Sequence, residues 1–341
     1  NLKNTDHPYR QKINLHFSGK VEIYTKDQLL NGQNFNPTTI NEQLSIFILS
    51  YDSLRSNNKD NRKIYQENGN LKDFSKSYKD TENLIPNVDE TALIQVINQM
   101  TPVIIVDESH NAETELSLEM LTNLNPSFIL DLTATPRNNS NIISYVDSLQ
   151  LKNENMVKLP VVVYNHHKME DVIADSIDLR KNLELKAIEE EEKTGKYIRP
   201  IVLFQAQPKG KEDNETFEKL KKKLIDSGIA ENEIAIKTSN INELKNVSLT
   251  DRDCSIRFII TVNALKEGWD CPFAYILATL ANKSSKVDVE QILGRILRQP
   301  YVKKHNEQLL NMSYVFTSSD NFRDTLDNIV KGLNKAGYSK K

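Results

Sequence analysis

The sequence predicts an α/β protein made of two domains with mostly parallel sheets. Short apolar runs alternate with stretches of helical spacing along most of the chain, which is the pattern of β-α-β units. Several of these runs end abruptly in polar residues, as strands do at the carboxyl edge of a parallel sheet. The chain has 341 residues, of which 38% are hydrophobic and 27% are charged, so it is long enough for two globular domains and is not biased toward disorder.

We expect the first domain at residues 1–150 and the second at residues 151–341. A stretch with little hydrophobic pattern, residues 149–159, is expected to link them. Residues 57–87 are polar and rich in Asn, Lys and Asp, and we interpret them as a surface insertion that is partly mobile.

The individual elements follow from the hydrophobic pattern. In the first domain, apolar runs predict strands at 21–24, 45–49, 102–106 and 128–132, and helical spacing predicts helices at 90–100 and 117–124. In the second domain, strands are predicted at 161–164, 201–204, 233–236, 257–261, 275–279 and 312–316. Helices are predicted there at 168–193 and 289–298. The acidic run at 189–192 closes the longer helix, and its simplest interpretation is a solvated face.

Bulk composition limits the classes of function. The formal charge of −3 gives no global basic field, so any nucleic-acid contact must come from local Lys and Arg residues. Two cysteines, Cys254 and Cys271, are too few for a disulfide framework and do not form a zinc pattern, which favours a reducing cytoplasm. No apolar stretch approaches the length of a membrane span. The chain begins at Asn1 rather than Met, which suggests that an upstream part is missing.

The first motif is the stretch PVIIVDESH at 102–110, where an apolar run ends in two carboxylates. A buried parallel strand reads as such a run, and acids at its carboxyl end face the crevice where these sheets bind ligands. Asp107 can hold a hydrated Mg²⁺ ion, and Glu108 can orient and deprotonate the water that attacks a γ-phosphate. For these residues alone, a strand that ends in a solvated turn is an equally good interpretation.

Two further motifs also follow predicted strands. In DLTATPR at 131–137, the hydroxyls of Thr133 and Thr135 can bond to the neighbouring acid loop and respond to a γ-phosphate, although alone the motif is a common turn. In TVNALKEGWD at 261–270, Gly268 permits a tight backbone just before Asp270; the alternative is a helix end with a glycine cap.

The fourth motif, VEQILGRILR at 289–298, reads as a helix. Offsets of four and three put Gln291, Arg295 and Arg298 on one face, where an anion such as a phosphate can join the two guanidinium groups. The alternative is an exposed basic stripe. Apolar residues at four positions are expected to bury the opposite side, namely Ile292, Leu293, Ile296 and Leu297. Gly294 is expected to mark a close approach of another segment.

Taken in order, DESH, TATP, TVNALKEGWD and QILGRILR resemble motifs II, III, V and VI of superfamily 2 helicases and translocases, over roughly residues 20–320. Residues 46–55 resemble the motif Ib region, and residues 201–205 resemble motif IV. Within that superfamily, KEGWDCP followed by VEQILGRILRQP is similar to the Res subunits of type III restriction enzymes. Leu297 fits their form of motif VI, since DEAD-box RNA helicases usually have glycine at that position.

The resemblance implies two RecA-like domains, the first truncated at its N-terminus, in an ATP- and Mg²⁺-dependent motor that moves along double-stranded DNA. The full-length relatives are type III site-specific deoxyribonuclease subunits that work with a methylation subunit (Mod) and carry a nuclease domain beyond the motor. It also implies a role for each matched residue. Four of these residues are implied to take part in ATP hydrolysis directly: Asp107 (Mg²⁺, through water), Glu108 (catalytic base), and Arg295 and Arg298 (arginine fingers that reach across the cleft). Gln291 supports the arginine fingers, and Gly268 and Asp270 contact the nucleotide. The others are Ser109, His110, Thr133 and Thr135 (coupling to movement), and Thr261 and Arg55 (nucleic acid).

Two expected parts of such an enzyme are absent from the sequence. The P-loop pattern G-x-x-x-x-G-K-[ST] does not occur, so we expect this chain alone to be inactive. No Pro-Asp dipeptide occurs, and the acid-x-Lys at 191–193, the one such element that suggests a nuclease, falls in the charged helix. Two alternatives remain: another superfamily 2 helicase acting on DNA or RNA, or a P-loop-less relative that binds nucleic acid or a partner without ATPase activity.

Overall fold

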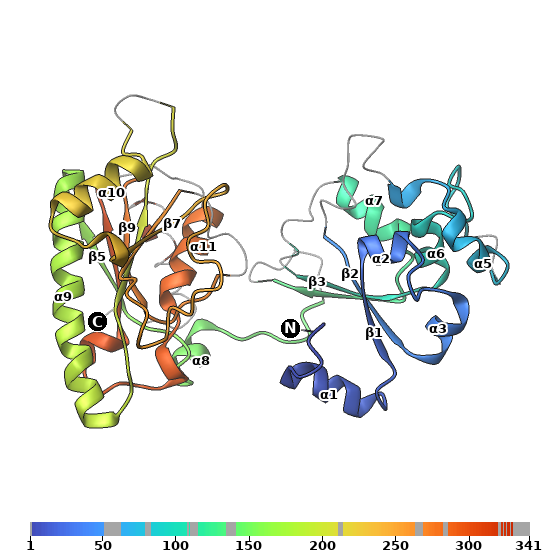
Figure 1. Cartoon of the computed structure of the whole chain (residues 1–341), viewed down its shortest axis with the longest axis horizontal. Helices are drawn as coiled ribbons and strands as arrows, with labels where there is room; N and C mark the ends of the chain where they lie inside the picture. Colours follow the sequence, from blue (N-terminus) through green and yellow to red (C-terminus); the bar gives the residue numbers. More distant parts are fainter. Residues whose placement is uncertain are drawn as a thin grey trace. The chain divides into compact units, whose positions relative to one another are not determined.

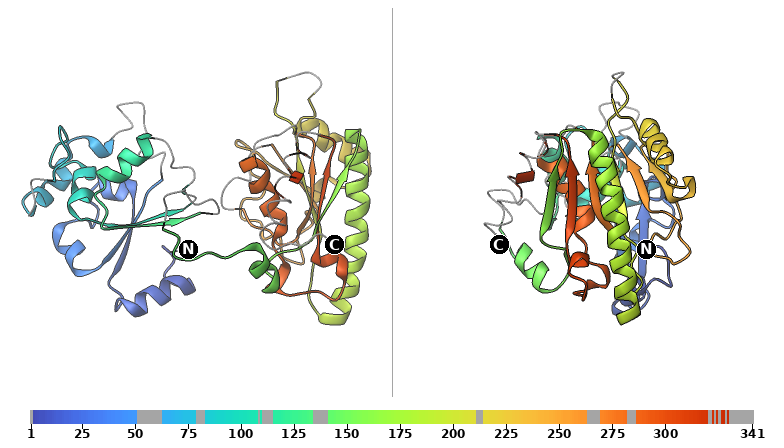
Figure 2. Two further views of the ribbon diagram at one scale, coloured as in Figure 1. Left: turned by 180° about the vertical axis from the view of Figure 1, so that it is seen from behind. Right: turned by 90° about the vertical axis from the view of Figure 1, so that its left-hand side faces the viewer.

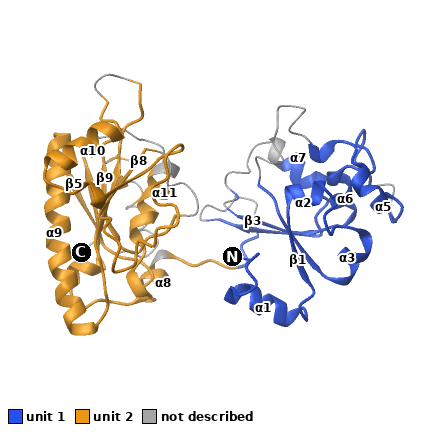
Figure 3. Cartoon of the chain, in the orientation of Figure 1, with its two compact units in different colours: residues 1–143 blue, residues 144–341 orange. Residues whose placement is uncertain are grey.

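The structure is a computed structural model that divides into two compact units, residues 1–143 (unit 1) and 144–341 (unit 2), each described by itself (Figure 3). The described residues are 2–50, 63–78, 83–107, 109, 115–133, 141–210, 214–262, 269–281, 286–319, 322, 324, 326, 327 and 329.

Unit 1 combines two pairs of parallel strands with short helices (Figure 1). β1 (Val21–Thr25) pairs with β2 (Leu44–Ile48), and β3 (Val103–Asp107) pairs with β4 (Phe128–Leu132). The helices are α1 (Pro8–His16), α2 (Lys26–Leu30), α3 (Pro37–Glu42), α5 (Lys72–Ser75), α6 (Leu93–Gln99) and α7 (Glu115–Asn123), with 3-10 turns η2 (Lys63–Tyr65) and η3 (Gly69–Leu71). The strands and helices predicted for this part are confirmed to within a few residues at each end.

The core of unit 1 includes part of the segment that the sequence suggested was a surface insertion. Ile64, Leu71 and Phe74 are all buried, and the Phe74 ring lies 4.7 Å from that of Phe35. The interpretation of a surface insertion is therefore wrong for residues 63–78. These apolar side chains are separated by polar turns, so they form no periodic pattern that the sequence could reveal.

The strand that leads to DESH is buried on one face only. Val106 is buried and Ile104 packs against the core, whereas Val103 and Ile105 are 64% and 63% exposed. Its neighbour β4 leaves Phe128 exposed beside Val103. The expectation of a buried strand is thus only half right, because the described core residues of unit 1 cover one side of this strand pair.

Unit 2 is built on a six-stranded parallel sheet in the order β5-β10-β9-β6-β8-β7. The strands are β5 (Val161–Asn165), β6 (Ile201–Gln205), β7 (Ile234–Lys237), β8 (Phe258–Thr261), β9 (Ala274–Thr279) and β10 (Ser313–Thr317). The helices are α8 (Ser148–Asn153), α9 (Met169–Thr194), α10 (Phe217–Asp226) and α11 (Lys286–Leu297), with 3-10 turns η5 (Glu231–Glu233), η6 (Pro300–Val302) and η7 (Gln308–Asn311). Figures 1 and 2 show α9 on one face of the sheet and α11 on the other.

The interior strands of this sheet are covered on both faces. Every residue of β6, β8, β9 and β10 is buried, as is typical of a parallel sheet with helices on each side. The predicted fold class, α/β with mostly parallel sheets, is confirmed. Among the described residues, no helix combines the length and the hydropathy that a membrane span needs.

The segment expected to link the domains is instead part of unit 2. It contains α8, whose N-terminus is capped by Asp147, and Val157 pairs with Arg298 as an isolated antiparallel bridge. The division between the compact units falls earlier, after Ile143. The sequence shows no pattern here because backbone bonds and a single buried side chain, Lys158, hold the segment in place.

One glutamate of the acidic run does not face solvent. Glu190 is 1% exposed, and its carboxylate accepts hydrogen bonds from the backbone N–H groups of Asn306 at 2.9 Å and Glu307 at 3.0 Å. The interpretation of a solvated face is therefore wrong for Glu190, although it fits the exposed Glu192.

Candidate nucleotide and nucleic-acid site

In unit 1, the predicted residues that the structure describes lie at the carboxyl ends of two neighbouring strands. Asp107 is the last residue of β3 and is in register with Leu132, so Thr133 follows at the adjacent strand end. Asp107 is exposed, Thr133 is half-buried and Ser109 is 1% exposed. The other residues predicted for this part lie outside the described residues, namely Arg55, Glu108, His110 and Thr135.

The chemistry of Asp107 fits a magnesium ion. Its carboxylate is accessible, and Mg²⁺ is usually held by one or two carboxylates together with water and phosphate oxygens. Within the described ranges, no group of three or more His, Cys, Asp or Glu side chains could hold a metal ion.

In unit 2, the packing of α11 orients the predicted arginines. Val289, Leu293 and Ile296 are buried in the core of the unit, which leaves Arg295 half-buried and Arg298 exposed. Ile292 and Leu297 pack against the same core, as predicted, and Gln291 is half-buried. The close approach expected at Gly294 is wrong, because a Cβ atom there would meet nothing within 4 Å.

Both arginines contact the loop that precedes β9. The Arg295 guanidinium donates a hydrogen bond from Nη1 to the carbonyl oxygen of Trp269 at 2.7 Å, and Arg298 forms an ion pair with Asp270. The side chains of this pair are 55% and 47% exposed, so we expect the pair to contribute only about 0–1 kcal/mol. The structure thus joins two of the motifs within one unit, in an arrangement from which an anion could displace Asp270. Gly268 lies outside the described residues.

The carboxyl edge of the large sheet carries buried polar residues that the sequence analysis mostly missed. Gln205, Thr261, Thr279 and Thr317 end four neighbouring strands, and each is at most 3% exposed. The hydroxyl of Thr279 donates to Oε1 of Gln205 at 2.9 Å. Thr261, predicted to contact a nucleic-acid phosphate, lies at this edge with its side chain buried. The sequence did contain a pattern that could have identified these residues, because each of the four apolar runs ends in a polar residue.

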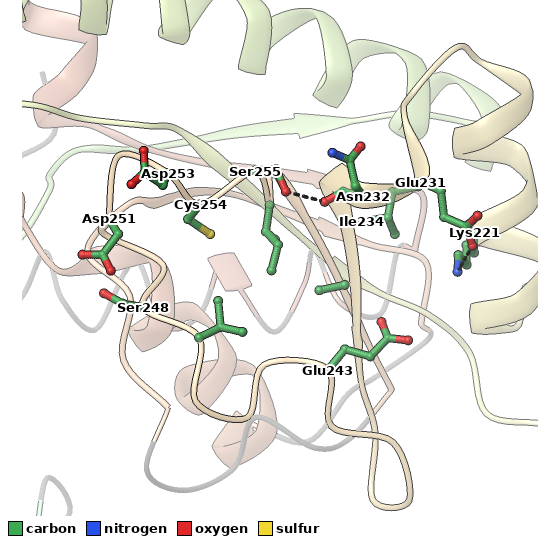
Figure 4. Close-up of a pocket in the computed structure, with 13 residues that line it drawn as sticks. Lys221, Glu231, Asn232, Ile234, Glu243, Ser248, Asp251, Asp253, Cys254 and Ser255 are labelled. Carbon is green, nitrogen blue, oxygen red and sulfur yellow. Dashed lines mark hydrogen bonds and ion pairs between the residues drawn. The ribbon is translucent and has the colours of Figure 1, made fainter.

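A pocket of about 610 Å³ lies elsewhere on unit 2, beside the edge strand β7 (Figure 4). Its lining includes Glu231, Glu243, Asp251 and Asp253, and none of the predicted site residues. Glu243 accepts a hydrogen bond from the backbone N–H of Ile236 at 2.6 Å, so this acid helps to cover the strand edge. We therefore assign the candidate site to the strand ends and to the contact between Arg298 and Asp270, and not to this pocket.

Both units are thus α/β structures with parallel strands. In unit 1, Asp107 and Thr133 lie at or after the carboxyl ends of such strands, where parallel sheets bind their ligands. In unit 2, Thr261 ends β8, whereas Asp270 precedes β9 and contacts Arg298, just beyond the end of α11. Residues 7–138 match the family model described as "Type III restriction enzyme, res subunit". The resemblance predicted from the motifs is confirmed for this part of the chain, which includes Asp107 and Thr133.

Solved structures that match the chain include proteins bound to RNA or to DNA. An S. cerevisiae Dbp5 variant bound to RNA and ADP BeF3 has a TM-score of 0.40 and 14% identity, covering 77% of this chain and 66% of that chain. The ATP-dependent type ISP restriction-modification enzyme LlaBIII bound to DNA has a TM-score of 0.41 and 14% identity, and the match covers 71% of this chain and 21% of that chain. A DEAD box protein from the hyperthermophile Methanococcus jannaschii has a TM-score of 0.39 and 16% identity, and the match covers 76% of this chain and 73% of that chain. The chain spans less than two thirds of the length of the first two. No curated protein sequence matches it.

Proposed function

We propose that this chain is the motor part of an ATP-dependent DNA translocase or helicase, of the kind found in the Res subunit of type III restriction enzymes. The observation that carries the proposal is the family match over residues 7–138, within which Asp107 ends β3 and Thr133 directly follows the adjacent strand β4. Duplex DNA as the track, a Mod-type subunit as the partner, a nuclease domain in the full-length enzyme and a cytoplasmic location belong to the same proposal.

In this motor, Asp107 holds Mg²⁺, and bound Mg²⁺ neutralises charge on the phosphates of ATP. Glu108 accepts the proton of the attacking water, while Ser109, His110, Thr133 and Thr135 report the state of the nucleotide. Arg295 and Arg298 stabilise the charge that develops on the transferred phosphoryl group, with Gln291 in support. Gly268 and Asp270 contact the nucleotide, and Thr261 and Arg55 contact nucleic acid. In this proposal, Arg298 exchanges Asp270 for a phosphate oxygen.

The test is steady-state ATP hydrolysis with and without duplex DNA, measured on this chain and on a longer polypeptide that supplies a P-loop. We expect the 341-residue chain to bind ATP weakly and to show no DNA-stimulated hydrolysis, because its sequence contains no P-loop to hold the phosphates. The longer polypeptide should hydrolyse ATP. In it, Glu108→Gln should abolish hydrolysis and retain binding, since the amide cannot accept the proton. An inactive longer polypeptide would contradict the proposal.

One observation favours a second candidate. The absence of the P-loop pattern from the sequence is also what we expect of a relative that binds nucleic acid without hydrolysing ATP. Equilibrium binding of single-stranded DNA, duplex DNA and RNA by the 341-residue chain distinguishes the candidates. Binding in the absence of ATP, combined with an inactive longer polypeptide, would favour the second candidate, and a preference for RNA would favour an RNA helicase.

A further inference from the structure

Unit 2 contains a fully buried lysine that the proposed function does not use. Lys158 is 0% exposed and lies just before β5. Its ammonium group donates hydrogen bonds to the carbonyl oxygens of Pro272 and Ala274, both at 2.8 Å, and lies 4.0 Å from the centre of the Tyr275 ring. The side chain therefore holds the backbone that runs from Asp270 into β9.

The backbone around Lys158 is fixed to the end of α11. The N–H of Lys158 donates to the carbonyl oxygen of Leu297 at 2.5 Å, and the N–H of Gln299 donates to that of Met156 at 3.0 Å. The hydroxyl of Ser313 lies within hydrogen-bond distance of the carbonyl oxygens of Lys158 at 3.2 Å and Ile296 at 2.9 Å. Residues 156–158, which we call the docking segment, thus pair with the chain on both sides of Arg298.

The docking segment consequently holds both partners of the Asp270–Arg298 ion pair. Its backbone pairs with the chain on both sides of Arg298, and its lysine side chain donates to the carbonyl oxygens of Pro272 and Ala274, two and four residues after Asp270. We propose that Lys158 is a positioning residue, which fixes the loop at 269–274 against the end of α11 and thereby sets the positions of Arg295 and Arg298. This inference rests on the proposed function for its catalytic meaning, but its geometry does not.

A lysine side chain is energetically unfavourable at a fully buried position such as 158. Burying an ammonium group is unfavourable unless fixed partners replace its water, and an apolar side chain of similar length would avoid that cost. The burial lowers the pKa of Lys158 to about 7. Both its charged and its neutral form carry enough N–H groups to donate to two carbonyls. The hydrogen bonds to Pro272 and Ala274 are therefore the feature that a methionine would lose.

The chain contains a single tryptophan, Trp269, which lies in the loop that Lys158 is proposed to hold. We would compare the full chain with the variants Lys158→Met and Lys152→Met by tryptophan emission, acrylamide quenching and far-UV circular dichroism. Lys152 is an exposed residue of α8 in the same part of the chain, so its variant is the matched control.

Lys158→Met should keep the circular dichroism spectrum, and its quenching constant for Trp269 should rise about twofold with a red shift in emission, because the loop opens locally. Lys152→Met should behave as wild type. An unchanged Trp269 signal in a folded Lys158→Met protein would overturn the proposal, and so would an equal change in Lys152→Met.

If Lys158→Met does not fold, Ser313→Ala takes its place. It removes the hydroxyl group that contacts the docking segment and the end of α11, so a milder increase in Trp269 quenching is expected, and wild-type quenching would overturn the proposal. These measurements need neither ATP nor DNA. A protein that never hydrolyses ATP would therefore contradict the proposed function while leaving the positional result for Lys158 intact.

Discussion

Glu190 provides the sharpest test of how unit 2 is held together. Glu190 is 1% exposed, and its carboxylate accepts hydrogen bonds from the backbone N–H groups of Asn306 and Glu307. Nδ1 of His305 lies 3.6 Å from Oε1 of Glu190. Glu190→Ala removes these two hydrogen bonds to a carboxylate and leaves the N–H groups of Asn306 and Glu307 without that acceptor. At about 1.5 kcal/mol for each such bond, the free energy of unfolding should fall by about 3 kcal/mol.

The assay is thermal unfolding followed by the fluorescence of Trp269, which reports on unit 2 because the chain has no other tryptophan. For a unit of this size, about 3 kcal/mol corresponds to a decrease in Tm of roughly 6–12 °C. The matched control is Glu192→Ala, two residues further along α9, whose exposed side chain should change stability by less than about 0.5 kcal/mol. Equal effects of the two substitutions would show that the buried hydrogen bonds of Glu190 do not stabilise unit 2, and would favour the interpretation of a solvated face.

Three further predictions concern other parts of the chain. In a longer polypeptide that hydrolyses ATP, Arg298→Ala should lower turnover by roughly a thousandfold and DNA affinity much less; an equal loss of DNA affinity in a binding titration would contradict its role. The pKa of Lys158 is lowered from 10.5 to about 7, so between these pH values its side chain binds more protons in the unfolded state, and its contribution to the free energy of unfolding should rise with pH. Urea titrations should show that Lys158→Met lacks this rise. Phe74→Ala should destabilise unit 1 by about 3–5 kcal/mol in urea unfolding followed by circular dichroism, whereas the exposed Phe17→Ala should have little effect.

The sequence predicted the strands well, for a physical reason. A parallel strand covered on both faces needs apolar side chains at nearly every position, so a continuous apolar run such as 201–204 indicates a buried strand. Helix α11 was equally clear, because one face packs in the core and the opposite face carries the arginines.

The missed features all depend on contacts between residues that are distant in the chain. Glu190 accepts from an N–H group 116 residues away, and the acceptors of Lys158 are 114 and 116 residues away. Nothing adjacent to either residue distinguishes it from a solvated charge. The ion pair between Asp270 and Arg298 belongs to the same class, although the two motifs that contain these residues were recognised separately.

The ion pair between Arg298 and Asp270 makes anion binding at this arginine an exchange reaction. Any phosphate that reaches Arg298 must first displace a carboxylate, and a pair that contributes about 0–1 kcal/mol weakens the apparent affinity for that phosphate by at most about fivefold. Salt weakens the outgoing and the incoming contact alike, because both are between partly exposed opposite charges. Phosphate binding at Arg298 should therefore depend less on ionic strength than binding at an exposed arginine that has no carboxylate beside it.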